Sequence, residues 1–93
     1  MQRAEAPVAT IMAFHEVDDV AHWLSSPKRG EVFGPMGITV RTFVDPTNPH
    51  RVGLLAEIPD MDAFQAVMAS EVGAEAMKFD GVRPETLVIL VQS

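Results

Sequence analysis

The chain has 93 residues, which fits one domain, and its formal net charge is −6 from 13 Asp and Glu against 7 Lys and Arg. It therefore lacks the basic surface that nucleic acids and anionic membranes require, and no apolar run approaches the roughly 20 residues of a membrane span. Without cysteine it can form no disulfide or thiolate site, which fits a cytoplasmic protein. Residues 1–7 contain no hydrophobic signal region, so we expect a flexible tail there and a single subunit over 8–93.

The first half of the chain predicts two strands that flank a broken helix. Residues 8–17 and 38–44 are rich in β-branched and aromatic residues without internal Gly or Pro, which favours strands. An aspartate at position 18 or 19 can cap the helix that follows the first strand. Pro27 interrupts this helix, and a second helical piece is expected to continue to residue 33. Three apolar residues at helical spacing form the expected buried stripe: Val20, Trp23 and Leu24.

The second half of the chain predicts a strand, a helix and a final strand. The segment 45–51, DPTNPHR, has the composition of a turn and leads into a strand over 52–58. A helix capped by Asp60 carries apolar residues at helical spacing and ends near Gly81. Two small residues are expected to divide this helix: Ser70 and Gly73. After Pro84, residues 85–92 predict the last strand.

The order β-α-β-β-α-β specifies a ferredoxin-like α+β fold, in which a four-stranded antiparallel sheet carries two helices on one face. The last predicted strand is apolar on both sides, with Leu87 and Ile89 on one and Val88 and Leu90 on the other. Leaving the second face in water would expose more apolar area than soluble monomers normally tolerate. We therefore expect a homodimer formed through the sheet face, with a monomer bearing an apolar sheet as the alternative.

Four stretches of the chain resemble the dimeric α/β-barrel superfamily: FHEVDDVAHW, GITVRTFVDP, NPHRVGLLAEIPDMDAF and RPETLVILVQ. The resemblance spans about Val8 to Gln92 and concerns the layout and the placement of aromatic, Pro and Asp residues. It implies a dimeric α/β barrel with a pocket between helices and sheet, like that of antibiotic-biosynthesis-monooxygenase and muconolactone-isomerase types. Because no motif of the haem-degrading members and no Asn–Trp pairing of the quinone-forming monooxygenases is present, no subfamily and no single reaction is implied.

His15 is the strongest candidate for chemistry. An imidazole near the end of an apolar strand can act as a general acid or base, or it can be a core group bonded to a carbonyl or an acid. Trp23, at the centre of the buried stripe, is either core or the wall of a pocket that stacks on a planar ligand. Phe14 and Phe33 are further candidate pocket walls. Arg41 lies in mid-strand, where it can pair with an acid on the next strand, Glu57, or anchor an anionic substrate.

The two other histidines are weaker candidates. His22 lies off the buried arc of its helix, on the side of Asp18, where it could form a small surface pair. His50 lies in the polar turn and could contact a partner subunit. The spacing of the three histidines matches no metal-binding motif, and no serine sits in a nucleophile signature, so we expect neither a metal nor another cofactor.

These features favour a small cofactor-independent enzyme of monooxygenase, isomerase or cyclase type that acts on an apolar, aromatic or anionic small molecule. A non-catalytic ligand-binding or dimerisation module is the alternative. An open pocket where His15 meets Trp23 and a polar group would favour the enzyme.

Overall fold

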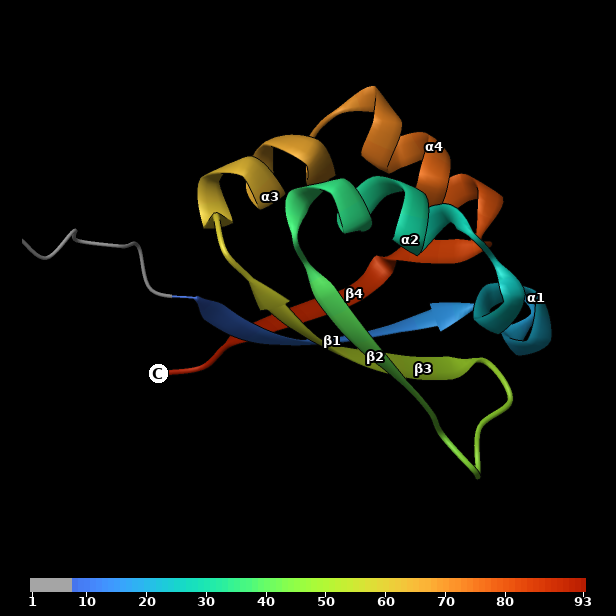
Figure 1. The fold of residues 1–93 in the computed structure, drawn as a ribbon. Helices are drawn as coiled ribbons and strands as arrows, with labels where there is room; N and C mark the ends of the chain where they lie inside the picture. Colours follow the sequence, from blue (N-terminus) through green and yellow to red (C-terminus); the bar gives the residue numbers. More distant parts are fainter. Residues whose placement is uncertain (1–7) are drawn as a thin grey trace, which may run out of the picture.

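The computed structural model describes residues 8–93, so the predicted tail over 1–7 lies outside the described residues. The strands of this part are β1 (Ala9–Val17), β2 (Thr39–Val44), β3 (Arg51–Ile58) and β4 (Val82–Val91). They form one antiparallel sheet in the order β2-β3-β1-β4, which confirms the predicted ferredoxin-like α+β fold (Figure 1). β4 begins three residues before its predicted start and runs through Pro84, which an edge strand tolerates because one side of it needs no ladder bonds.

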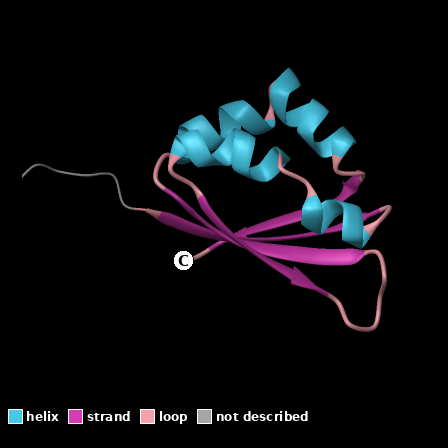
Figure 2. Cartoon of the chain, turned by 45° about the vertical axis from the view of Figure 1, so that its right-hand side comes forward, coloured by secondary structure: helices cyan, strands magenta, loops and turns pink. Residues whose placement is uncertain are grey.

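All the helices of the described part lie on one face of the sheet (Figure 2). They are α1 (Val20–Ser25), α2 (Lys28–Phe33), a 3-10 turn η1 (Gly34–Met36), α3 (Met61–Met68) and α4 (Glu71–Phe79). Side chains cap the predicted starts: Asp19 accepts from the His22 amide and Asp60 from the Ala63 amide. Ser70 caps α4 in the same way, and this cap divides the second helical region where it was expected to divide.

The core between sheet and helices has two buried clusters. The larger cluster lies between the sheet and α3, and its buried members are Ile11, Ile38, Ala56, Ile58 and Phe64. The smaller lies at the other end, where Trp23 of α1 packs on Val17 and Val52. Leu24 was predicted to share this burial but is exposed, because the short helix α1 turns only Trp23 fully toward the sheet.

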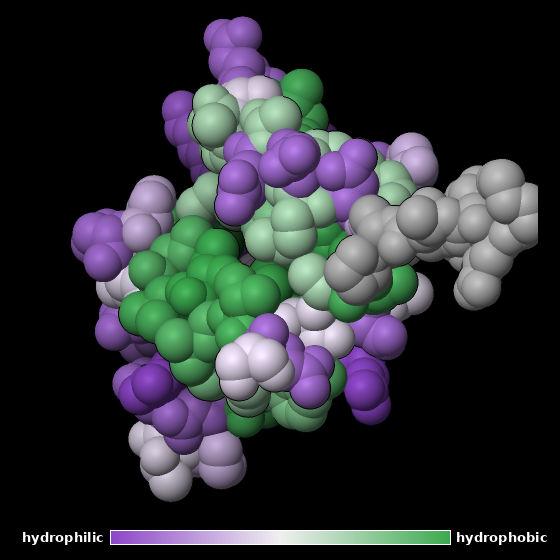
Figure 3. Space-filling view, turned by 90° about the vertical axis from the view of Figure 1, so that its left-hand side faces the viewer, coloured by the Kyte–Doolittle hydropathy of each residue, from purple (hydrophilic) through white to green (hydrophobic). Residues whose placement is uncertain are grey.

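The opposite face of the sheet has no helix against it within residues 8–93. Strand alternation sends every second side chain to this outer face, and several of those side chains are large, apolar and exposed: Val8, Met12, Phe43, Val88 and Leu90. At the end of the molecule where β4 finishes, hydrophobic side chains gather in one continuous area (Figure 3). The outer face therefore carries exposed apolar side chains, as predicted, beside polar ones such as Arg41 and Glu57.

Candidate functional site

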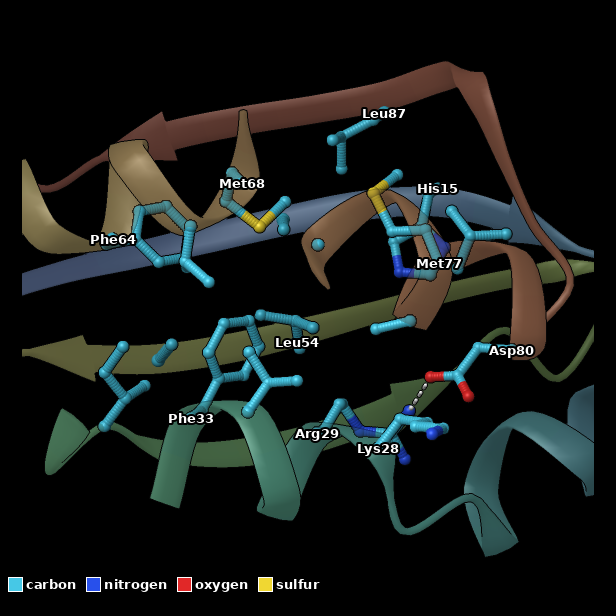
Figure 4. A pocket seen from close by; sticks show the side chains of 18 of the residues that line it. His15, Lys28, Arg29, Phe33, Leu54, Phe64, Met68, Met77, Asp80 and Leu87 are labelled. Carbon is cyan, nitrogen blue, oxygen red and sulfur yellow. Dashed lines mark hydrogen bonds and ion pairs between the residues drawn. The ribbon is translucent and has the colours of Figure 1, made fainter. Parts of the chain in front are cut away.

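A cavity of about 90 Å³ lies between the sheet and the helices, between the two core clusters. This volume is enough for several water molecules but is smaller than the roughly 150 Å³ of a cavity that encloses benzene, so part of an aromatic ligand would extend through the opening. Apolar side chains from every layer form most of its wall, among them Phe33, Leu54, Phe64, Met68 and Leu87. Polar groups gather at one end, where His15, Lys28, Arg29 and Asp80 lie close to one another (Figure 4).

An irregularity in β4 opens the sheet beside His15. The pairing of β1 with β4 runs from Phe14 opposite Val88 directly to Glu16 opposite Arg83, so β4 has three more residues than a regular ladder needs. The hydroxyl of Thr86 holds this bulge by accepting a hydrogen bond from the Glu16 amide at 2.8 Å and donating one to the Arg83 carbonyl at 2.6 Å. Bulges are common beside active sites because they free a side chain from the regular ladder.

His15 points from β1 into the polar end of the cavity and is only 5% exposed. Its ring meets the Trp23 ring edge to face, with centroids 5.6 Å apart. No residue in the described part of the chain offers a hydrogen-bond partner to its Nδ1 atom. Burial lowers the pKa of His15, and the charge of Arg29 acts in the same direction, while the main chain of Glu16 and the charge of Asp80 oppose the shift. The imidazole is therefore neutral near pH 7 and able to accept a proton.

Arg29 of α2 connects the polar groups at this end of the cavity. Its guanidinium lies over the Trp23 ring at 4.3 Å and donates to the Trp23 carbonyl at 2.7 Å. It also pairs with Asp80 at 3.4 Å, which fixes one carboxylate oxygen. Burial lowers the pKa of Arg29, and Asp80 opposes the shift. The arrangement places a partly buried cation and a buried anion beside a neutral base.

Asp80 follows α4 and is 4% exposed. Its Oδ2 atom takes the ion pair with Arg29, while Oδ1 is buried without a hydrogen-bond partner among residues 8–93. A buried polar atom without a partner costs free energy, so its persistence in a cavity wall is a feature of binding sites. The cavity thus has two such atoms at one end, Nδ1 of His15 and Oδ1 of Asp80.

The structure brings together three of the five candidate site residues. His15, Trp23 and Phe33 all line the cavity. Phe14 and Arg41 do not, because strand alternation turns both to the outer face of the sheet, where Phe14 packs over Gly53 and Arg41 lies opposite Leu55. Their expected placement in the pocket is corrected accordingly. Within the described chain, no ion pair joins Arg41 to Glu57.

The remaining histidines hold the chain together rather than line the cavity. The His22 ring bonds the Phe79 carbonyl through Nε2 at 2.7 Å, and Asp18, its expected partner, binds Arg83 instead. His50 bonds the Val17 carbonyl through Nδ1 at 3.0 Å, which ties the β2–β3 hairpin to the end of β1.

Sequence reasoning missed Arg29 and Asp80. Arg29 shares a helix face with Val32 and Phe33, three and four residues later, and Asp80 stands in the same relation to Met77 and Ala76. This spacing would have marked both as inward-facing. Residues 8–93 contain no group of three His, Cys, Asp or Glu side chains placed to hold a metal. In the same range no helix has the length and apolarity needed to cross a bilayer.

Comparison with known proteins places the fold but no activity. No protein-family model matches the chain, and a search of curated proteins found no match. A solved antibiotic biosynthesis monooxygenase has 16% identity and a TM-score of 0.60, covering 91% of this chain and 96% of its own. A protein from Pseudomonas aeruginosa has 13% identity and a TM-score of 0.61, covering 97% and 96%.

A third solved protein, from Bacteroides thetaiotaomicron and described as of unknown function and a possible oxidoreductase, has 11% identity and a TM-score of 0.52, covering 91% of this chain and 93% of its own. At these identities the likeness concerns the fold. The chain has the ferredoxin-like fold of antibiotic-biosynthesis-monooxygenase-like proteins, which confirms the predicted resemblance at that level.

Proposed function

We propose that the chain is a small cofactor-independent enzyme in which His15 removes a proton from an apolar small molecule bound in the central cavity. The observation that supports this most is a buried imidazole, neutral near pH 7, which lines an apolar cavity and whose Nδ1 has no hydrogen-bond partner among the described residues. Reactions of monooxygenase, isomerase and cyclase type on activated carbon acids all need such a base. The fold shared with an antibiotic biosynthesis monooxygenase agrees with this class of chemistry.

The test is hydrogen–deuterium exchange at a carbon acid. With 2-indanone as the probe, a small apolar ketone, we expect the protein in D₂O to accelerate exchange of the α-hydrogens on the order of 100-fold over buffer, as general-base catalysis does. His15→Phe should abolish the acceleration, and His22→Gln, which removes an exposed imidazole outside the cavity but keeps a donor for the Phe79 carbonyl, should keep it. NMR measures both binding and exchange. Binding without exchange would contradict the enzyme and favour a non-catalytic ligand-binding module.

We further propose that the protein works as a homodimer whose two copies cover each other's outer sheet faces, in the cytoplasm. The apolar side chains exposed on that face support this, because a second copy of the same face is the partner that matches them without further components. The expected result is a dimer in sedimentation at micromolar concentration. A monomer there would contradict this proposal and leave the cavity proposal standing.

A further inference from the structure

The polar end of the cavity carries information about which ligand it accepts. It has two buried polar atoms without a partner in the described part of the chain, Asp80 Oδ1 and His15 Nδ1, on side chains that are 4% and 5% exposed. Both side chains line the same cavity and lie at the same end of it (Figure 4). A ligand that binds here gains most by supplying what these two atoms need.

The carboxylate oxygen can only accept a hydrogen bond, whereas the neutral imidazole nitrogen donates or accepts according to its tautomer. A hydroxyl suits both, because it can donate to Asp80 Oδ1 and can donate to or accept from His15 Nδ1. A carboxylate cannot donate, and its charge would face that of Asp80 in an apolar wall where screening by solvent is weak.

Arg29 does not offset that repulsion. Its guanidinium is already paired with Asp80 Oδ2 at 3.4 Å, donates to the Trp23 carbonyl at 2.7 Å and lies over the Trp23 ring. Lys28, the other cation at this end, pairs with Glu31 on its own helix at 3.7 Å. Because each cation is paired with a carboxylate, the positive and negative charges at this end balance each other before a ligand arrives. A site with balanced charge and apolar walls favours a neutral ligand.

Resting on the proposed function, we infer that Asp80, held by Arg29, makes the cavity specific for a neutral, mainly apolar molecule that carries a hydroxyl, and that it excludes carboxylates. The sequence left open whether the ligand is neutral or anionic, and this inference selects a neutral ligand. Asp80 is then a specificity-determining residue and His15 the group beside which the hydroxyl binds.

The test uses three probes with one ring and one methyl group in common: p-cresol, toluene and p-toluate. NMR titration of the wild-type protein at pH 7 should give p-cresol a Kd at least tenfold lower than p-toluate. p-Cresol should also bind severalfold more tightly than toluene, the gain of one hydrogen bond to a charged group. Equal or tighter binding of p-toluate would overturn the inference and leave the cavity proposal intact. Failure of all three to shift the signals of His15 and Trp23 would overturn both.

A matched pair of variants assigns the effect. Asp80→Asn removes the charge but keeps a side chain of the same shape, so the preference for p-cresol over p-toluate should fall at least tenfold. Asp62→Asn makes the same change at an exposed position in the first turn of α3 and should leave the preference unchanged. An unchanged preference in Asp80→Asn would contradict the role of Asp80. Should Asp80→Asn fail to fold, the preference of the wild-type protein for p-cresol over p-toluate decides whether the cavity selects a neutral ligand.

Discussion

The two faces of the sheet differ in how they are completed. The inner face is covered by the chain's own helices, and its side chains form two buried clusters around a small cavity. The outer face carries exposed apolar side chains among polar ones such as Arg41 and Glu57; it lies open and has no buried polar atom without a partner among residues 8–93. The difference agrees with the proposed division of roles, in which the inner face binds the ligand within one subunit and the outer face packs against a second subunit.

The largest expected effect concerns the outer face. Val88→Glu would place a carboxylate from each subunit in the proposed interface, where it would lose its water without gaining a partner. We expect the dimer to weaken on the order of 1000-fold, equivalent to about 4 kcal/mol. Val72→Glu is the matched control, because Val72 on α4 is 56% exposed and Val88 is 50% exposed. Sedimentation measures the dimer dissociation constant of each variant. Equal dissociation constants for Val88→Glu and Val72→Glu would contradict the assignment of the interface to the sheet.

The next effect concerns the helical cover of the inner face. At Gly73 a methyl group would overlap the Val67 carbonyl oxygen and come within 3.2 Å of the Met68 Cα, so the α3–α4 junction would have to move. We expect Gly73→Ala to lower the free energy of unfolding by about 2 kcal/mol and to weaken binding of p-cresol, with no change in oligomeric state. Gly30→Ala meets nothing within 4 Å and should stabilise α2 by up to about 1 kcal/mol. Urea unfolding compares the two, and equal losses of stability would contradict the close packing at Gly73.

The smallest effect concerns His15 and the pH dependence of stability. Burial lowers its pKa in the folded chain, so below about pH 6.5 the unfolded chain binds a proton that the folded chain does not. Stability therefore falls as the pH is lowered, by at most about 1 kcal/mol between pH 6.5 and 5.5 from this group. His15→Phe should remove this part of the dependence and His22→Gln should keep it. Urea unfolding at pH 6.5 and 5.5 gives the change in the free energy of unfolding for each protein. The same change in wild type and His15→Phe would contradict a lowered pKa of His15.

The sequence predicted the fold well because its signals are local. Strand composition, the aspartate and serine caps and the breaks at Pro27 and Ser70 each depend on a few neighbouring residues, and the structure follows them. The apolar outer face also follows from strand alternation alone. The predicted burial of Leu24 was wrong because a helix of six residues has too few turns to bury a whole stripe.

The candidate site was only half predictable. His15, Trp23 and Phe33 were found because apolar periodicity marks inward-facing positions. Arg29 and Asp80 come from elements 51 residues apart in the chain, and their pairing depends on how α2 meets the end of α4. The bulge in β4 also follows from tertiary contacts, since Thr86 replaces a ladder bond to Glu16 that strand propensity assumes to be regular.

The role of His15 as the base of the cavity is best tested by an NMR titration of its ring nitrogens with pH, in the absence and presence of p-cresol. We expect the ring to stay neutral to below the usual pKa of histidine, because it is buried, and p-cresol to shift its nitrogen signals at pH 7. A ring that titrates at the usual pKa, with nitrogen signals that p-cresol does not move, would contradict the proposal that His15 is the base of a ligand-binding cavity.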